Sequence, residues 1–277
     1  LGDDTSPETN DWTESGSLGA NNQTVDTPTK NYITFNPLQK DSNITLENGN
    51  TIADDPTTTN WNTVATTMTI PLTGKYYFEM TAIDIGVDFG IGVCGASDIT
   101  VTSYFGADAT CMGFFSNGNL KYVNGSSAAY GNATSYTYAA GTGIGVAVDR
   151  DNDAIWFSVI NSGTQEWIDG DGTDSSATVL AEIEAGTTTS AMSTGLADDI
   201  MPVMSPSYTN GRGSIEAPTS SWNGDSIPTG FVALNQDNMA ANTAGITGLS
   251  WIKNRDAADD HILQDRVRGI YKYFISN

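Results

Sequence analysis

The sequence is poor in basic residues and has no long apolar run. Lys and Arg together number 11 against 33 Asp and Glu among 277 residues, which gives a formal net charge of −22. Because such an acidic surface repels phosphate groups and anionic membranes, we expect no nucleic-acid partner. No stretch approaches the roughly 18 consecutive apolar residues that a membrane-spanning helix needs, so membrane insertion is not expected either.

Histidine is nearly absent, which leaves little for nucleophilic catalysis. The single histidine, His261, lies in a charged stretch without a Gly-x-Ser-x-Gly motif nearby, and neither cysteine has an evident histidine partner. Carboxylates are abundant, and a glycosidase needs only two of them across a cleft. Glu79, on an expected strand among apolar residues, is the acid to test first. We expect a protein that is not an enzyme, with a carbohydrate-active enzyme as an alternative.

Cysteine is also scarce, with only Cys94 and Cys111 in the chain. Cys94 ends the short run that begins at Gly92, where a small buried thiol is the ordinary expectation. The alternative is a disulfide with Cys111, because a loop-rich chain can bring two such residues together. Two cysteines do not identify the redox compartment of the protein.

Apolar residues alternate with small or polar ones in several stretches, which predicts β-strands. The stretch 141–159 alternates, turns through a run rich in Asp and Asn, and alternates again, as a β-hairpin does. Gly-Ile-Gly-Val occurs twice, at 90–93 and at 143–146, and glycine inside a strand indicates that a large neighbour or another backbone comes close. Turn signals recur about every ten residues, a spacing that favours a sandwich or a barrel.

Residues in these strands resemble the SPRY-like domain, a β-sandwich of the concanavalin type. The matching motifs are the Lys-aromatic-Glu strand at 74–79, the two Gly-Ile-Gly-Val motifs, Tyr122 and Gly125 between them, and the Val-Asp ending of 143–149 followed by the apolar run 155–157. They cover about residues 44–216. The resemblance implies an all-β, antiparallel β-sandwich of the SPRY/concanavalin-like jelly-roll type, with extended N- and C-terminal segments. It also implies that Glu79 is a structural residue.

Four longer phrases have a narrower resemblance. They are VDTPTKNYITFNPL (25–38), SNGNLKYVNGSSAAYG (116–131), PTGFVALNQDNM (228–239) and GLSWIKNRDAADDHILQDRVRG (248–269), and they are similar to phrases in multi-module virion proteins of marine and cyanobacterial tailed phages. The resemblance implies a tail-fibre-like structural protein at the surface of the virion. Its partners would be other virion subunits, in a homotrimer, and a host surface glycan or protein. The alternative is a capsid or tail decoration protein that binds no receptor.

The same resemblance indicates how the chain is divided. Residues 1–40 would be an extended arm or the end of a preceding module, and residues 41–217 would be the SPRY-like sandwich. Residues 218–247, which are rich in Asn and Gly, would form an extended linker. The last segment, 248–277, would open a further module or form a C-terminal segment.

Aromatic residues in or beside expected loops are the candidate ligand-binding residues. Tyr104, Phe105, Tyr122 and Tyr130 have rings that can stack on the face of a sugar or fill a protein interface. The alternative is that several of these rings point inward and belong to the sandwich. Loops carry recognition more often than the strands that support them, so the sequence favours this group as the binding surface.

An acidic loop is the candidate metal site. Asp169, Asp171 and Asp174 surround Gly172 and offer oxygen ligands at alternate positions, as Ca²⁺ favours. The rest of an EF-hand loop is missing, and the alternative is a solvated turn. A second cluster of Asp at 149–153 is expected to form the tip of the hairpin. No other cofactor is expected.

Overall fold

The computed structural model describes residues 31–56, 60–105, 110–116, 121–123, 126–128, 137–170, 172, 174–207, 210–216, 227–239, 249–252, 261–265 and 273–276. The chain falls into two compact units, Leu1–Asn238 and Met239–Asn277, and each is described by itself. No helix within these ranges is long and apolar enough to cross a membrane.

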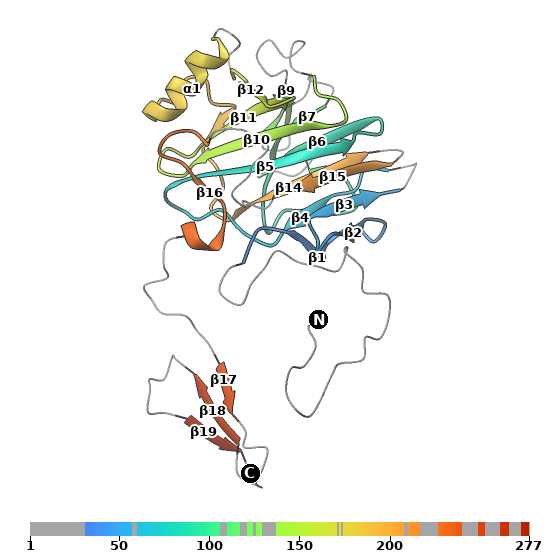
Figure 1. The fold of residues 1–277 in the computed structure, drawn as a ribbon, viewed down its shortest axis with the longest axis vertical. Helices are drawn as coiled ribbons and strands as arrows, with labels where there is room; N and C mark the ends of the chain where they lie inside the picture. Colours follow the sequence, from blue (N-terminus) through green and yellow to red (C-terminus); the bar gives the residue numbers. More distant parts are fainter. Residues whose placement is uncertain are drawn as a thin grey trace, which may run out of the picture. The chain divides into compact units, whose positions relative to one another are not determined.

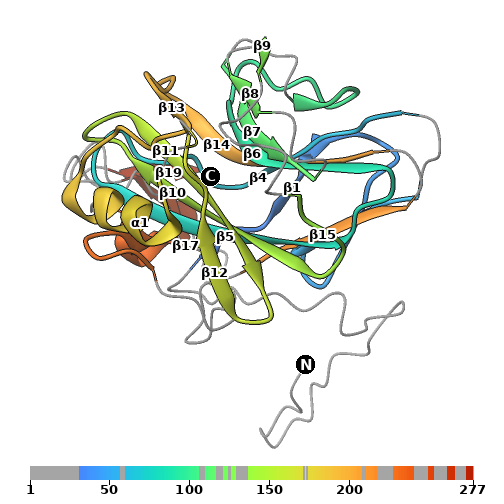
Figure 2. The same ribbon diagram turned by 90° about the horizontal axis from the view of Figure 1, so that it is seen from above.

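Seven strands of the first unit form one antiparallel sheet (Figures 1 and 2). In spatial order they are β1 (Phe35–Lys40), β4 (Val64–Thr66), β14 (Ile200–Ser207), β6 (Asp88–Gly95), β7 (Met112–Phe115), β8 (Lys121–Val123) and β9 (Ser126–Ala128). Strands β6 and β14 pair along their whole length, from Asp88 opposite Ser207 to Gly95 opposite Ile200. This long pairing forms the middle of the sheet.

A second sheet of nine strands faces the first. Its main antiparallel path is β12 (Thr164–Trp167), β11 (Ala154–Asn161), β10 (Thr142–Asp149), β5 (Lys75–Asp84), β15 (Gly211–Ile215), β3 (Ile52–Asp55) and β2 (Thr45–Glu47). The short strands that join it are β13 (Ser193–Thr194), beside β11, and β16 (Val232–Ala233), parallel to β5 and followed by the 3-10 helix η4 (Gln236–Asn238).

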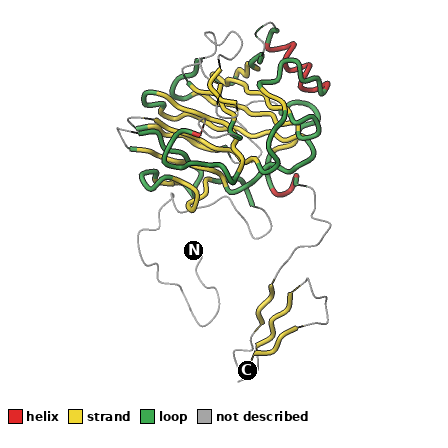
Figure 3. Tube along the Cα trace, turned by 180° about the vertical axis from the view of Figure 1, so that it is seen from behind, coloured by secondary structure: helices red, strands yellow, loops and turns green. Residues whose placement is uncertain are grey.

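The core lies between the two sheets. Strands β10 and β11 form the expected hairpin, with Val146 opposite Phe157, and Ile144, Val146 and Val148 are buried on one face. Across the sandwich, the ring centroids of Phe157 and Phe114 of β7 lie 6.3 Å apart, so this is the face that packs on the seven-stranded sheet. The all-β sandwich expected from the sequence is confirmed, and strands dominate the chain trace in Figure 3.

Glycine allows close approach where the repeated motif predicts it. At Gly90, a Cβ atom would lie 2.6 Å from Cζ of Phe115, and at Gly92 it would lie 2.6 Å from Cα of Gly113 on the neighbouring strand. At Gly145, it would overlap the hydroxyl of Tyr77. The prediction that a large neighbour or another backbone comes close to these glycines is therefore confirmed.

The helix α1 (Ser176–Ala185) covers part of the outer face of the nine-stranded sheet (Figure 1). Its buried residues Val179 and Ile183 pack in one cluster with Trp156 of β11 and Trp167 of β12. The helix begins after a serine whose side chain accepts a backbone hydrogen bond, and it ends at a glycine in the left-handed conformation. Both ends therefore have the caps that stabilise a short helix.

The sandwich extends further at both ends than the range 41–217 expected from the sequence. Phe35 is fully buried and β1 pairs with β4, so this strand belongs to the sheet and not to an extended arm. At the other end, Leu234 is buried and donates its N–H to the Tyr77 carbonyl, so residues 227–238 pack on the sandwich and are not a linker. Proline is tolerated in β1 because one side of an edge strand has no partner strand.

The second unit contains a three-stranded antiparallel sheet. Its strands are β17 (Leu249–Ile252), β18 (His261–Asp265) and β19 (Tyr273–Ser276), with β18 in the middle. The expectation that residues 248–277 open a further module stays a prediction. Residues 1–30 of the expected arm lie outside the described part of the chain.

Candidate functional site

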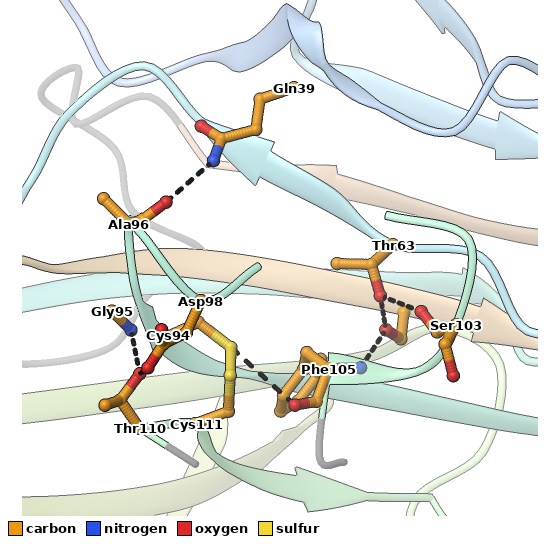
Figure 4. Close-up of a disulfide and its surroundings, with 11 residues drawn as sticks. Gln39, Thr63, Cys94, Gly95, Ala96, Asp98, Ser103, Phe105, Thr110 and Cys111 are labelled. Carbon is orange, nitrogen blue, oxygen red and sulfur yellow. Dashed lines mark hydrogen bonds between the residues drawn. A yellow bond between two sulfur atoms is a disulfide. The ribbon is translucent and has the colours of Figure 1, made fainter. Parts of the chain in front are cut away.

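A disulfide closes the long loop between β6 and β7. Val93 of β6 lies opposite Met112 of β7, so the next pair outward is Cys94 and Cys111, which are joined by a disulfide and fully buried (Figure 4). The expectation of a free buried thiol at Cys94 was wrong, because the strand register brings the second cysteine opposite it. The loop 96–110 therefore leaves the sheet and returns to it at one covalently joined point.

Hydrogen bonds hold the described part of this loop against the sheet (Figure 4). Their donors and acceptors come from four parts of the chain that are far apart in sequence. The bonds are Gln39 Nε2 to Ala96 O (3.2 Å), Thr63 Oγ1 to Ser103 O (2.6 Å), Phe105 N to Ser205 Oγ (3.2 Å), Gly95 N to Thr110 Oγ1 (3.1 Å) and Thr110 Oγ1 to Asp98 Oδ2 (2.8 Å). The described part of the loop is thus fastened at both ends and at Ser103 and Phe105.

Phe105 anchors the loop from below. Its side chain is fully buried, its ring stacks on Phe115 with centroids 5.2 Å apart, and it fills the space above Gly113, where a Cβ would overlap the ring. The expectation that Phe105 binds a ligand was wrong, because the ring is enclosed by the sheet. Phe105 instead follows the alternative expectation, that some of these aromatic rings point inward and belong to the sandwich.

Tyr104 and Trp61 form a half-buried aromatic pair above this anchor. Their ring centroids lie 5.6 Å apart, and each ring also contacts Phe115, at 5.5 Å from Trp61 and 6.5 Å from Tyr104. Alternation along β7 places Phe115 on the outer face, because its neighbour Phe114 points into the core. Ligand binding by Tyr104 stays a prediction. Trp61, which pairs with it, was not among the sequence candidates because it lies far from the loop in sequence.

The other two candidate aromatics are less fully described. Tyr122 belongs to β8 and lies opposite Gly113 of β7 in the strand register, but its side chain is outside the described part of the structure. Tyr130 lies outside the described residues altogether. Ligand binding by Tyr122 and Tyr130 stays a prediction.

The acidic loop before α1 is organised around a buried carboxylate. Asp169 is 1% exposed, and its Oδ2 accepts the backbone N–H of Asp174 at 2.6 Å. Asp171 lies outside the described residues, and within those that are described no three His, Cys, Asp or Glu side chains are grouped to hold a metal ion. The bond from Asp174 shapes the turn into the helix. Calcium binding by Asp169, Asp171 and Asp174 stays a prediction.

Glu79 lies in a buried polar network on the outer side of the nine-stranded sheet. It is 1% exposed, and Oε1 accepts a hydrogen bond from the Tyr77 hydroxyl at 2.6 Å. Gln165 Nε2 in turn donates to the Tyr77 hydroxyl and to Ser158 Oγ, both at 2.9 Å. The network fits because Gly145 has no side chain between these groups. The burial and these bonds indicate a structural role for Glu79.

Asp149 closes the hairpin tip. Its carboxylate is fully buried, forms an ion pair with Lys75 (Nζ to Oδ2, 3.0 Å) and accepts a hydrogen bond from Asn152 Nδ2 at 2.9 Å. Burial opposes ionisation of this carboxyl, but the hydrogen bonds from Asn152 and Lys75 and the charge of Lys75 outweigh it, so the pKa of Asp149 lies below its ordinary value. The expectation that the cluster 149–153 forms the hairpin tip is confirmed.

Replacing Asp149 by Asn is expected to lower the free energy of unfolding by about 2 kcal/mol at neutral pH, because the charged hydrogen bonds are lost. The folded-state pKa of Asp149 is depressed, so its contribution is complete above the unfolded-state pKa and disappears as the pH falls through the folded-state value. The difference in urea unfolding between the two proteins should therefore begin to shrink near pH 4, the ordinary pKa of an aspartate, and should vanish only below the folded-state pKa of Asp149. A difference that stays constant down to pH 2 would contradict this assignment.

No family model and no curated protein matches the sequence. Among solved structures, the chain is similar to the SPRY domain of human HERC1, with a TM-score of 0.45 and 14% identity, over 67% of this chain and 98% of that one. It is also similar to the TRIM65 PSpry domain, with a TM-score of 0.45 and 13% identity, over 68% of this chain and 93% of that one. It is also similar to stonustoxin (0.46, 17%), over 67% of this chain and 27% of the toxin. Two of these structures are SPRY domains. The two sheets of the sandwich are defined by the strand pairing of this chain.

Proposed function

We propose that this chain is a binding module at the surface of a virion, a tail-fibre-like structural protein of a tailed phage. In this proposal it joins neighbouring virion subunits, as a homotrimer, and attaches to a glycan or protein on the host surface through the loops of the sandwich. It carries out no chemical reaction.

The observation that carries the proposal is the fastened loop with its aromatic pair. The disulfide Cys94–Cys111 and the bonds to the sheet hold the loop in place, and Tyr104 and Trp61 lie half-buried above Phe115. Rings that are already ordered lose little side-chain entropy when a partner covers them. Tyr and Trp are also the residues that most often dominate binding energy at interfaces.

Two further features support a role at the outside of a particle. Disulfides persist mainly in oxidising surroundings, so the Cys94–Cys111 bond suits a protein that works outside the reducing cytosol. The phrases at 25–38, 116–131, 228–239 and 248–269 resemble those of tailed-phage virion proteins. The net charge of −22 favours a neutral or basic receptor over an anionic one.

Replacing Tyr104 or Trp61 by Ala is expected to weaken adsorption of the labelled full chain to susceptible cyanobacterial cells by about tenfold, the cost of losing one dominant aromatic contact. Leu72→Ala is the matched control, because Leu72 is a large apolar side chain that is 59% exposed and lies away from the loop in sequence. Binding curves should separate the two aromatic variants from the control. Near-ultraviolet circular dichroism would verify that all three variants are folded.

A decoration protein without receptor binding is the alternative. In that case the three variants would adsorb to the cells equally weakly. Unlabelled chain would not compete with labelled chain, because the adsorption would be non-specific. A carbohydrate-active enzyme is less well supported, because Glu79 is buried and bound by the Tyr77 hydroxyl. Release of sugar fragments from a host polysaccharide by the purified chain would overturn the proposal.

A further inference from the structure

The outer face of the nine-stranded sheet is covered at one end and hollowed at the other. Tyr77 and Trp156 lie in the cluster beneath α1 and Phe231. Further along the same face, the surface sinks into a half-open pocket of about 270 Å³. The pocket is lined by Thr81, Gly141, Gly143, Ile160, Ser162 and Gly163.

The missing side chain of Gly143 makes the floor of this pocket. Strand register places Gly143 between Thr81 of β5 and Ile160 of β11, and residues opposite each other point to the same side of a sheet. A Cβ at Gly143 would lie 3.2 Å from Cβ of Ile160, so even a methyl group would occupy the floor. At the rim, Gly141 and Gly163 have nothing within 4 Å of the position of a Cβ. Backbone therefore forms much of the surface that a ligand would touch.

The polar side chains that line the pocket carry hydroxyls, and one of them is bonded to a carboxylate. Thr81 Oγ1 donates to Glu216 Oε1 at 3.2 Å, and Ser214 Oγ donates to the same oxygen at 3.1 Å. The Glu216 backbone N–H is bonded to the Glu79 carbonyl, which fixes Glu216 beside β5. Thr81 and Ser162 supply hydroxyls, and none of the lining residues that the structure describes is Lys, Arg or His.

This set of groups selects for a neutral ligand that is rich in hydroxyls. Hydroxyls can accept hydrogen bonds from such a ligand, whereas an anion would find no cation among the described lining residues and would be repelled by the Glu216 carboxylate that is bonded to Thr81. Ile160 and the glycine floor offer an apolar patch for the C–H face of a ring. A volume of about 270 Å³ lies just below the range typical of drug-sized ligands, which suits a single ring.

We propose that this pocket binds one neutral sugar residue, as a second glycan site on the sheet opposite to the Tyr104 loop. This inference rests on the proposed attachment to a host surface and adds a ligand class to it. The geometry of the pocket does not depend on the Tyr104 loop. A host glycan could then be bound at two separate surfaces of one sandwich, which would raise the overall avidity of a fibre.

The test of this site is a titration of the full chain with the methyl glycosides of glucose, galactose and mannose. Binding is monitored by saturation-transfer NMR and by chemical-shift changes. At least one neutral glycoside should bind saturably, and glucuronate should bind at least about tenfold more weakly because of the carboxylate and the absence of a cation. Thr81→Val keeps the shape of the side chain and removes the hydroxyl, so it should weaken binding by about fivefold. Gly143→Ala should weaken it by about tenfold or more by filling the floor.

Leu72→Ala is the matched control, because Leu72 is a 59% exposed apolar side chain that belongs neither to the Tyr104 loop nor to the lining of the pocket, and it should leave glycoside affinity unchanged. If Gly143→Ala does not fold, Thr81→Val decides the question, because β-branched residues of equal shape are well tolerated in strands. The proposal is overturned if none of the three neutral glycosides binds, if glucuronate binds equally well, or if Thr81→Val retains full affinity. All titrations are carried out in the Tyr104→Ala background, so that glycoside bound at the Tyr104 loop does not contribute to the measured affinity.

Discussion

Replacing Gly92 by Ala is expected to lower the free energy of unfolding by about 3 kcal/mol, at the upper end of the cost of overpacking a core. A Cβ at this position would overlap the Met112 carbonyl oxygen and would lie 2.6 Å from Cα of Gly113. Both atoms belong to the backbone of β7, which cannot move without breaking its pairing with β6. The strands would have to separate, and the disulfide at the next pair outward would be displaced with them.

Gly143→Ala is the matched control, because Gly143 belongs to the second copy of the Gly-Ile-Gly-Val motif. The nearest atom to its Cβ would be Cβ of Ile160 at 3.2 Å, a contact that a displacement of a few tenths of an ångström relieves. The expected loss is below about 1 kcal/mol, since Ala also removes the entropic cost of glycine in a strand. Guanidinium unfolding of the two variants measures the difference. Equal losses would contradict the contacts described for β6 and β7.

Reducing the Cys94–Cys111 disulfide is expected to lower the free energy of unfolding by about 3 kcal/mol, the chain-entropy value for a closed loop of this size. The two cysteines are separated by 17 positions in the sequence. Without the covalent link, the unfolded chain has a higher conformational entropy, because residues 94 and 111 no longer have to stay together. Guanidinium unfolding with and without a phosphine reductant gives the difference directly.

The double variant Cys94→Ala/Cys111→Ala controls for other effects of the reductant, because its unfolding midpoint should not respond to it. The variant should also bind cells more weakly than the unaltered chain, since one end of the Tyr104 loop is no longer fastened. A midpoint of the unaltered chain that is insensitive to the reductant would show that the disulfide does not form in solution.

Short-range patterns predicted the strands well because their physical cause is local. The alternation around Val146 indicates a strand with one buried face, and this signal is contained in neighbouring residues. The Asp-rich turn after Asp149 indicates that the chain reverses its direction there. Residues with few apolar neighbours in sequence were less well predicted. Phe35 was assigned to an arm and Phe231 to a linker, and both are buried in the sandwich. Their partners lie on strands that are distant in sequence, so no local pattern contains the contact.

The candidate site shows the same limit at the level of single side chains. Tyr104 and Phe105 are neighbours in one loop, yet one is half-buried at the surface and the other is enclosed above Gly113. Aromatic character identified both, but which ring points inward depends on where the sheet leaves a space. Trp61 had no local signal for recognition, and only the folded loop brings it to Tyr104.

The amino-acid sequence by itself determined the class of the fold, the acidic charge and the positions where glycine would be needed, because alternation, charge and the absence of a side chain belong to each residue or its near neighbours. Tertiary structure alone decided that the cysteines are paired, that Phe105 is a packing residue, and that glycine lies under a ring at Gly90 but opens a pocket at Gly143. Each of these outcomes depends on the register between paired strands and on how the connecting loop packs on the sheet, and alternation along a single strand fixes neither of them.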